Sequence, residues 1–263
     1  MMAASNEELV EVLIERLLDE MPAYRDKADR VDAPNRRCLL RALMNVRPPM
    51  PLDESFLRLQ DELLSREAAE RGVVHVADLP RCLQDNRISV WRGDITRLDA
   101  DAIVNAANSA LLGCFVPCHS CIDNAIHSAA GLQLRDECAR IMAAQGHDEQ
   151  TGVAKVTAAY NLPAAHVIYT VGPIVPSRSP DAKDARLLAS CYESCLDLAR
   201  KQGLHSIAFC CISTGEFGYP NEPAAQVACK TVRAWLDRTD YPIHVIFDVF
   251  KEVDLDAYEH LLG

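Results

Sequence analysis

The stretch DAIVNAANSALLGC, residues 101–114, contains a short apolar run and two asparagines. Similar short apolar runs occur at several other places in the chain. Residues 102–107 contain Ile103 and Val104 and have the length and composition of a buried strand. Similar runs occur at 88–91 (ISVW), 154–160 (AKVTAAY), 166–172 (HVIYTVG), 206–213 (SIAFCCIS) and 244–250 (HVIFDVF). We therefore predict a six-stranded sheet.

Helical patterns separate these strands. Residues 121–144, 184–202 and 221–238 have helical character, and the run DLDAYEHLL at 254–262 closes the chain with a short helix. Strands that alternate with crossover helices are typical of an α/β fold. Since we find no internal repeat and no low-complexity tract, we expect one α/β sandwich.

The amino-terminal part of the chain is different, because its apolar residues follow a helical period throughout. Three helical runs occur, at 6–21, 35–46 and 54–72. Ser5 or Asn6 can cap the first run, and Gly72 is a suitable end for the third. We expect residues 1–72 to form a helical extension and residues 73–263 to form the α/β domain.

The composition of the chain limits its partners. It has 263 residues, 49% of them hydrophobic, a net charge of −11 and a pI near 5.2. The hydrophobic content predicts a large core. The negative net charge disfavours electrostatic binding to nucleic acid or to an anionic membrane, which would need surplus Lys and Arg. No apolar stretch reaches the roughly 18 residues of a membrane span. We expect a soluble monomer without nucleic-acid or membrane partners.

Eleven cysteines could indicate a disulfide framework, but the start MMAASNEELVEVL lacks the features of a secretory signal. Four of the cysteines lie inside apolar helical or strand-like runs: Cys191, Cys195, Cys210 and Cys211. We interpret most of the eleven as buried thiols of a protein in the reducing cytoplasm.

Polar or aromatic residues follow four of the predicted strands, where open α/β sheets bind ligands. Asp94 follows the first strand, and Asn105 and Asn108 belong to or follow the second. The loop STGEFGYPNEPAAQ, residues 213–226, leads from a strand into a helix whose amino terminus can face an anion. Phe250 could stack on a base. Each feature alone is more often a cap, a turn or core packing.

The order of these motifs is more specific than any one of them. The series GDIT (93–96), DAIVNAAN (101–108), IDNAIHSAAG (122–131), TGVAKVTAAYNLPAAHVIYTVGP (151–173) and STGEFGYP (213–220) resembles the macrodomain family, whose members bind ADP-ribose. The resemblance covers residues 88–262. It implies a three-layer α/β/α fold with a mixed central sheet, so that residues 73–263 would be a macrodomain.

A second resemblance concerns the segment GCFVPCHSCIDNAIH at 113–127, where ordinary macrodomain hydrolases carry a run of glycines. This segment is similar to the zinc-containing branch of the family, as are LLRALMNVRPP (39–49), QDELL (60–64) and GVV (72–74). By this resemblance one Zn²⁺ per chain is held by Cys114, His119 and Cys121. Such a Cys₂His set leaves the fourth zinc position open for water or substrate.

Other interpretations of the cysteine-rich segment remain. Cys118 and Cys121 have C-x₂-C spacing, and four ligands would make a closed structural site. We expect Cys118 to be a bystander, since one ion that contacts both Cys118 and His119 would need severe backbone bending. The remaining alternatives are unligated buried thiols, or a disulfide between Cys114 and Cys121.

The resemblance also implies which residues contact the ligand. It implies that Asp94 and the amide of Ile95 bind the adenine and that Asn108 faces the distal ribose. The pyrophosphate is expected at the loop 213–217, because backbone amides and the following helix dipole attract anions. The full set of expected ADP-ribose-binding residues is Asp94, Ile95, Asn108, Cys121, Ile122, Asp123, Ser213, Thr214, Gly215, Glu216 and Phe217.

The expected catalytic residues are Asp123 and Asn108. Asp123 matches the macrodomain carboxylate near the distal ribose, although an Asp before NAIHSAAG is also a good helix N-cap. Hydrolysis of an ADP-ribosyl bond needs water to attack the anomeric carbon. Zinc would orient the ribose or activate water, and Asp123 would assist the attack. Asn124 is a further candidate contact to the ribose, whereas His127 is expected to be structural.

The sequence thus predicts a zinc-dependent hydrolase that releases mono-ADP-ribose from modified protein side chains. A non-catalytic ADP-ribose reader and a hydrolase of a small ADP-ribose derivative are the alternatives. Relatives of this branch are expected to act opposite a sirtuin-type ADP-ribosyltransferase that modifies a lipoyl-carrier protein, so such a carrier is the implied partner.

Overall fold

A computed structural model describes residues 4–263. Its centre is a six-stranded sheet with the order β1-β6-β5-β2-β4-β3. The strands are β1 (Ile88–Arg92), β2 (Ala102–Ala106), β3 (Ala154–Ala158), β4 (His166–Thr170), β5 (Ser206–Phe209) and β6 (His244–Val249). All neighbours pair in parallel except β3, which runs antiparallel to β4 at the sheet edge. The predicted mixed sheet is therefore confirmed.

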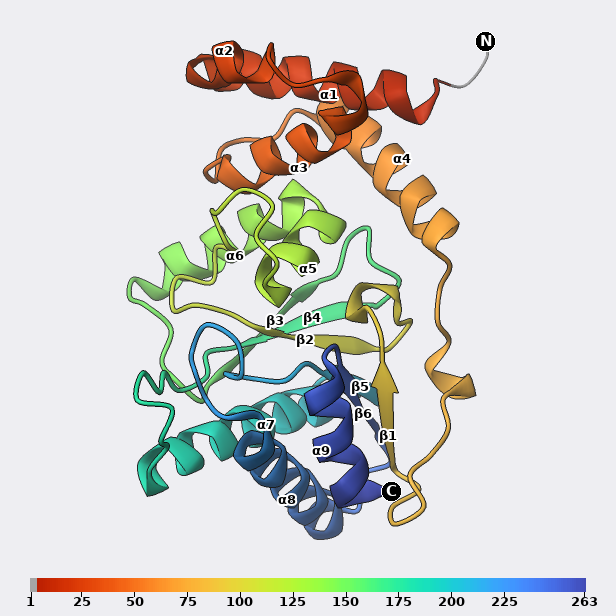
Figure 1. The fold of residues 1–263 in the computed structure, drawn as a ribbon, viewed down its shortest axis with the longest axis vertical. Helices are drawn as coiled ribbons and strands as arrows, with labels where there is room; N and C mark the ends of the chain where they lie inside the picture. The colour runs from red at the N-terminus through yellow and green to blue at the C-terminus, as the bar shows by residue number, and fades with distance from the viewer. Residues whose placement is uncertain (1–3) are drawn as a thin grey trace.

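Helices cover both faces of the sheet, which gives the predicted three-layer α/β/α fold (Figure 1). One face carries α5 (Ile122–Ala130) and α6 (Leu132–Gln145), and the other carries α7 (Ala182–Lys201), α8 (Asn221–Thr239) and α9 (Glu252–Leu262). Strands β5 and β6 are buried throughout and β2 is buried except at Ala106, as expected for parallel strands covered on both sides.

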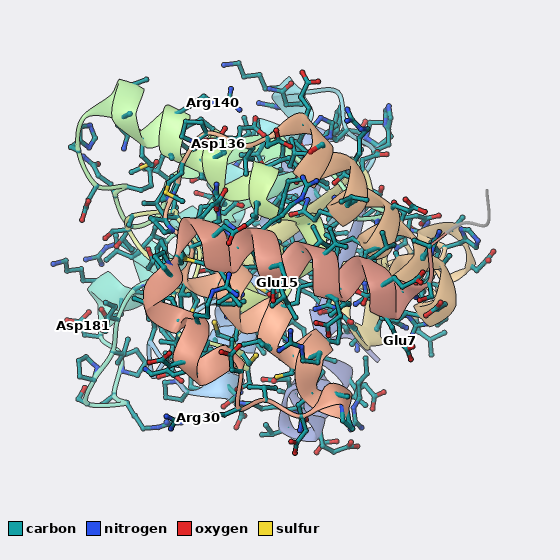
Figure 2. The ribbon with its side chains drawn as sticks, turned by 90° about the horizontal axis from the view of Figure 1, so that it is seen from above. Glu7, Glu15, Arg30, Asp136, Arg140 and Asp181 are labelled. Carbon is teal, nitrogen blue, oxygen red and sulfur yellow. The ribbon has the colours of Figure 1, made fainter. Side chains whose placement is uncertain are left out.

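The amino-terminal helices form a further layer on top of α5 and α6. They are α1 (Asn6–Glu20), α2 (Arg25–Ala28), α3 (Arg36–Val46) and α4 (Glu54–Arg71), and α4 descends along the side of the domain (Figure 1). Figure 2 looks down on this end and shows α1, marked by Glu7 and Glu15, lying over the rest of the molecule. Ser5 caps α1 in a capping box with Glu8.

These helices have a hydrophobic core of their own. Its buried members are Leu9, Val10, Leu13, Ile14, Leu17, Leu18, Met21, Ala28, Leu40, Leu43, Met44, Phe56, Leu63 and Leu64, together with Leu132 from α6. Leu132 therefore joins the extension to the α/β domain. In residues 4–263, no helix is both long enough and apolar enough to cross a membrane.

The predicted helix over 121–144 is wrong in one respect, because it is two helices that break at Gly131. This glycine has a φ of +96°, which side-chain-bearing residues rarely adopt. A Cβ at Gly131 would also lie 2.5 Å from Nε2 of Gln60 on α4, and Oε1 of Gln60 accepts a 2.9 Å hydrogen bond from the amide of Leu132. The break thus depends on a distant helix, which the local pattern cannot reveal.

The cysteines also differ from the prediction. All eleven are free thiols, but only five are buried: Cys138, Cys191, Cys195, Cys210 and Cys229. The interpretation that most of them are buried is therefore wrong. Those inside helices and strands of the α/β domain are mostly covered, whereas Cys38 is exposed and the three cysteines in the loop 113–121 are half-buried.

Candidate functional site

Four loops meet at one edge of the sheet because β1, β6, β5 and β2 are parallel neighbours. Asp94 follows β1, Phe250 follows β6, Ser213 follows β5 and Asn108 follows β2. The carboxyl edge of an open α/β sheet is the usual ligand-binding edge. The structure therefore brings residues that are distant in the sequence to one edge of the sheet. Asp94 and Phe250, for example, are 156 positions apart.

Asp94 and Phe250 lie at the β1–β6 end of this edge. Oδ1 of Asp94 accepts hydrogen bonds from the amide of Thr96 at 3.0 Å and from its hydroxyl at 2.7 Å. Its second oxygen lies 3.8 Å from Nη1 of Arg71 and is open to an amino group of a ligand. The Phe250 side chain is 76% exposed, so its ring is available for stacking, whereas the Ile95 side chain is buried.

The loop after β5 is arranged to hold an anion. Ser213 has a φ of +66° and is 5% exposed, and its buried hydroxyl oxygen has no partner among residues 4–263. Within residues 4–263, the amides of Gly215, Glu216 and Phe217 have no hydrogen-bond acceptor. Thr214, in contrast, donates from its amide and its hydroxyl to the carbonyl of Cys211. Consecutive free amides form a concave site that suits phosphate oxygens.

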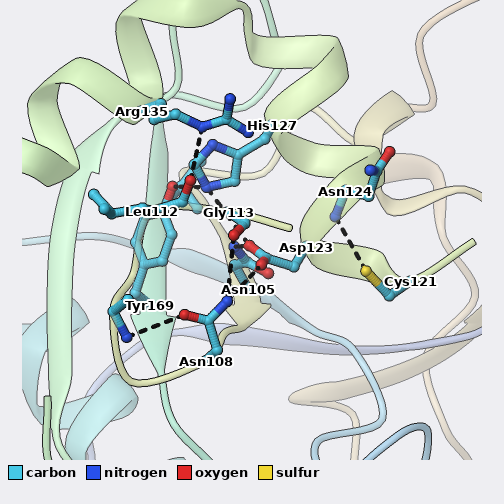
Figure 3. Close-up of polar contacts among 12 residues, drawn as sticks. Asn105, Asn108, Leu112, Gly113, Cys121, Asp123, Asn124, His127, Arg135 and Tyr169 are labelled. Atoms are coloured by element: carbon cyan, nitrogen blue, oxygen red, sulfur yellow. Dashed lines mark hydrogen bonds and ion pairs between the residues drawn. The ribbon is translucent and has the colours of Figure 1, made fainter. Parts of the chain in front are cut away.

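Asp123 occupies a buried polar pocket in the first turn of α5. Its carboxylate accepts a 2.7 Å hydrogen bond from Nδ2 of Asn105, and Nδ2 of Asn108 lies 3.5 Å from its other oxygen (Figure 3). Burial raises the pKa of Asp123 to about 6, while the hydrogen bond from Asn105 and the charge of Arg135 act in the opposite direction. The structure thus brings Asn108 and Asp123, the two expected catalytic residues, into one cluster.

His127 lies behind Asp123 in a buried position that suits the structural role expected for it. Its ring is buried, its Nε2 lies 3.5 Å from Oδ1 of Asp123, and it shares a 3.2 Å hydrogen bond with the hydroxyl of Tyr169. Burial lowers the pKa of His127 to about 3, so the ring is neutral. Gly113, with a φ of +80°, packs against this ring, where a Cβ would come within 2.9 Å of it.

Arg135 is a buried cation that the sequence analysis missed. Its Nε donates to the carbonyl of Leu112 at 2.7 Å, and Nη1 donates to the carbonyls of Met44 and Arg47. Its guanidinium also lies 4.4 Å from the ring centre of Phe115. Burial lowers the pKa of Arg135 to about 10, where it is still charged at neutral pH. It thereby ties α6 to α3 and to the loop that contains Cys114.

The three expected metal ligands converge in space. One donor atom from each of Cys114, His119 and Cys121 lies within 4.8 Å of the others. Cys121 is also the N-cap of α5, and its sulfur accepts from the amide of Asn124 at 3.4 Å. Nδ1 of His119 is buried without a partner among residues 4–263. A thiolate–thiolate–imidazole set at this separation fits a tetrahedral zinc ion with one open position.

Cys118 points away from this group. Its sulfur lies 3.3 Å from that of Cys38 on α3. We call residues 113–121, which carry the Cys₂His set, the metal loop. This loop approaches the loop 213–217, since Nε2 of His119 lies 3.8 Å from a carboxylate oxygen of Glu216. Three groups with different chemistry therefore adjoin one another: the free amides, the Cys₂His set and the Asp123 carboxylate two residues after Cys121.

The extension holds the metal loop in place through α3, which the sequence analysis also missed. Nη2 of Arg41 donates to Oδ1 of Asn124 at 2.7 Å and to the carbonyl of His119 at 3.3 Å. Oδ1 of Asn45 accepts from the amide of Cys118 at 2.9 Å, and its Nδ2 donates to the hydroxyl of Ser128. A signal existed, because Arg41 and Asn45 are four residues apart in the otherwise apolar segment 38–46.

Asn124 is not free to contact a ligand. It is fully buried, its Oδ1 accepts from Arg41, and its Nδ2 donates to the carbonyl of Val116 at 3.0 Å. Its suggested contact to the ribose is therefore wrong. The side chain instead links α5 to α3 and to the metal loop.

Comparison with known proteins agrees with this geometry. The Macro domain family profile matches residues 104–228. A protein-ADP-ribose hydrolase of Treponema medium is 48% identical over 253 residues, which span 95% of this chain and 97% of that protein. The chain belongs to the macrodomain family. Its helical extension lies within the matched length.

Two solved macrodomains have the same fold. The macrodomain of Trypanosoma brucei in complex with ADP-ribose is 34% identical with a TM-score of 0.65, and the match covers 81% of this chain and 92% of that one. The Oceanobacillus iheyensis macrodomain with ADP is 36% identical with a TM-score of 0.60, covering 66% and 88%.

Proposed function

We propose that this macrodomain is a zinc-dependent hydrolase that removes mono-ADP-ribose from modified protein side chains and releases free ADP-ribose. The observation that carries the proposal is the position of Asp123, a buried carboxylate two residues after Cys121 in a loop that gathers a Cys₂His set. The name of the Treponema medium relative supports the reaction class. Zinc itself is supported by the donor set alone.

The residues of the site divide the ligand among them. The free amides at Gly215–Phe217 and the unpartnered hydroxyl of Ser213 suit the pyrophosphate. We assign the adenine to Asp94 and the Ile95 amide, and the exposure of the Phe250 ring supports stacking on the adenine. This order leaves the distal ribose between Asn108 and Asp123, close to Cys121 and Ile122.

Asp123 accepts a proton from the attacking water while the bond from the anomeric carbon to the leaving side chain breaks. Asn105 holds the carboxylate in position, and the amide of Asn108 is close enough to orient both the carboxylate and a ribose hydroxyl. The partial positive charge on the ribose in the transition state is stabilised by the nearby carboxylate. A zinc ion held by Cys114, His119 and Cys121 would supply Lewis acidity at this point.

The test combines metal analysis with a release assay. Purified protein is analysed for zinc, and ADP-ribose release is measured on a mono-ADP-ribosylated protein with and without a chelator. An ADP-ribosylated lipoyl-carrier protein is the first substrate to use, and a second modified protein and an acetylated ADP-ribose are the comparisons. We expect about one zinc per chain and release that the chelator abolishes.

The outcomes separate the alternatives. Binding of ADP-ribose without any release would identify a reader, and faster turnover of the acetylated ADP-ribose would identify a hydrolase of small derivatives. Full activity in protein that contains no metal would contradict the zinc requirement. We further propose that the protein acts as a cytoplasmic monomer, with residues 1–72 as a cap on the macrodomain of residues 73–263.

A further inference from the structure

Two cysteines outside the metal set face each other across the boundary between the extension and the α/β domain. The sulfur of Cys38 on α3 lies 3.3 Å from the sulfur of Cys118 in the metal loop, although the residues are 80 positions apart. Cys38 is exposed and Cys118 is half-buried, so oxidants in solution can reach the pair. Neither thiol has a part in the proposed hydrolysis.

The backbone around the pair is fixed from both sides. Cys38, Arg41 and Asn45 are spaced by three and four residues, so they lie on one face of α3. All three contact the segment 118–128: Arg41 reaches the carbonyl of His119, and Asn45 accepts from the amide of Cys118 at 2.9 Å. These hydrogen bonds hold the two backbone segments together, so the two sulfurs lie close to each other.

Cys118 has an unusual backbone conformation for its type. Its φ is +51°, in the left-handed region that residues with a Cβ seldom adopt. A glycine would fit this position with less strain, yet the chain has a cysteine there. The Cys118 thiol lies against Cys38 on α3 and is not one of the three donor groups that converge at Cys114, His119 and Cys121.

We propose that Cys38 and Cys118 are a modification site at which a peroxide converts two thiols into a reversible disulfide that ties α3 to the metal loop. The exposed sulfur of Cys38 attacks one peroxide oxygen, the O–O bond breaks, and water leaves with the thiol proton. The sulfur of Cys118 then attacks the resulting sulfenic acid, the S–O bond breaks, and a second water leaves. Two thiols are oxidised by two electrons and one peroxide is reduced.

The geometry favours this pair over the other cysteines. A disulfide needs the sulfurs about 1.2 Å closer than they are, a change that rotation of the exposed Cys38 side chain can supply. Five of the remaining cysteines are buried in the α/β domain. Cys114 and Cys121 are also close together, and a metal ion bound there would occupy both sulfurs.

The link would join two hydrophobic cores that otherwise meet through packing and hydrogen bonds. It would close a loop of about 80 residues, and long closed loops restrict the unfolded chain most strongly. We therefore expect the oxidised protein to unfold at a higher temperature than the reduced protein, by several degrees.

The test treats the full-length protein, as purified, with hydrogen peroxide, blocks the remaining thiols, and maps disulfides by mass spectrometry of unreduced peptides. We expect a peptide that contains Cys38 joined to Cys118, a raised melting temperature, and reversal of both by a dithiol. Cys38→Ser and Cys118→Ser are each expected to remove the cross-linked peptide and the thermal shift. The matched control is Cys82→Ser, a half-buried cysteine away from α3, which is expected to keep both.

Two results would overturn the proposal. One is a linked peptide between Cys114 and Cys121 with none between Cys38 and Cys118. The other is oxidation of Cys38 to sulfinic acid without a cross-link in the wild-type protein. Peptide mapping is combined with the zinc content of the same sample, so failure here and failure of the proposed function can be told apart.

Discussion

Nδ2 of Asn105, on β2, donates a 2.7 Å hydrogen bond to Oδ1 of Asp123, in the first turn of α5. Asn105 is fully buried and Asp123 is 5% exposed, so the bond is shielded from water. It joins the sheet to the helix that begins at the metal loop, and it fixes one carboxylate oxygen while the other remains near Asn108 (Figure 3). The position of the carboxylate is therefore set by a residue that sits inside a strand.

Replacing Asn105 with Ala is expected to lower kcat/KM for ADP-ribose release by about 10- to 100-fold, because a buried hydrogen bond to a carboxylate contributes about 1.5–3 kcal/mol. The measurement is steady-state release of ADP-ribose from a modified protein. Asn86→Ala, an exposed asparagine at the opposite end of the sheet, is the control and is expected to have wild-type kinetics. An Asn105→Ala enzyme with unchanged kcat/KM would show that the bond does not position Asp123.

Arg41→Ala is expected to weaken metal binding, because Arg41 holds both the carbonyl of His119 and the side chain of Asn124. Outer-shell contacts of metal ligands are typically worth about 10- to 100-fold in metal affinity. Competition with a chromogenic chelator measures the change. Arg37→Ala is the matched control: Arg37 lies on the same helix but pairs with Glu67 on α4, so its loss is expected to leave zinc affinity unaltered.

Part of this site could be predicted from local sequence, since several of the expected ligand-binding residues follow a recognisable strand. Asp94, Asn108 and Ser213 lie at or just after the ends of the predicted strands. Parallel pairing brings the ends of these strands together. The Cys₂His set was predictable because its three residues lie within nine positions. In these cases the information that places the residue is close to it in the chain.

The missed features depend on contacts between distant segments. Arg135 is buried because three carbonyls from α3 and two loops surround it, and Gly131 breaks a helix because Gln60 approaches from α4. Neither residue has a local signal that separates it from an ordinary helical position. The prediction that Asn124 contacts the ribose failed for the same reason, because its side chain accepts a hydrogen bond from Arg41 on α3.

The roles of Cys118 and Cys121 can be separated by substitution. Cys121→Ser is expected to lose most of the bound zinc and the hydrolase activity, because it removes one of only three protein ligands. Cys118→Ser is expected to keep about one zinc per chain, since its thiol faces Cys38. Metal content after gel filtration is the measurement. Loss of zinc from Cys118→Ser, with Cys121→Ser still loaded, would reverse the assignment of the ligands.

Leu13→Ala tests the core of the extension. Leu13 has no exposed surface among the helices α1, α3 and α4, and such truncations cost about 2–5 kcal/mol of unfolding free energy. Val12 is its neighbour on the same helix and is 44% exposed, so Val12→Ala is expected to cost less than about 0.5 kcal/mol. Urea unfolding followed by circular dichroism measures both. Equal effects of the two substitutions would mean that the extension is not packed as described.

Two histidines that are buried in neutral form are expected to lower the stability of the protein as the pH falls below neutrality, against an opposite contribution from Asp123, whose pKa is raised by burial to about 6. Burial lowers the pKa of His244 to about 4 and that of His127 to about 3, with a smaller contribution from Arg81 and Arg135 respectively. In the unfolded chain both rings have a pKa of about 6.5. Below that pH the unfolded state therefore binds protons that the folded state cannot, and the free energy of unfolding decreases.

The stability that the neutral rings contribute is fully present above about pH 6.5. It is lost progressively toward pH 4 for His244 and pH 3 for His127, on the order of 3 kcal/mol for His244 and on the order of 5 kcal/mol for His127. Urea unfolding at a series of pH values measures it. His244→Gln, which can retain a hydrogen bond to the hydroxyl of Ser89, is expected to flatten the dependence between pH 6.5 and 4, whereas the exposed His260→Gln is the control and is expected to leave it unaltered. If His244→Gln has the same slope as wild type, the ring is protonated in the folded protein and the buried neutral state is refuted.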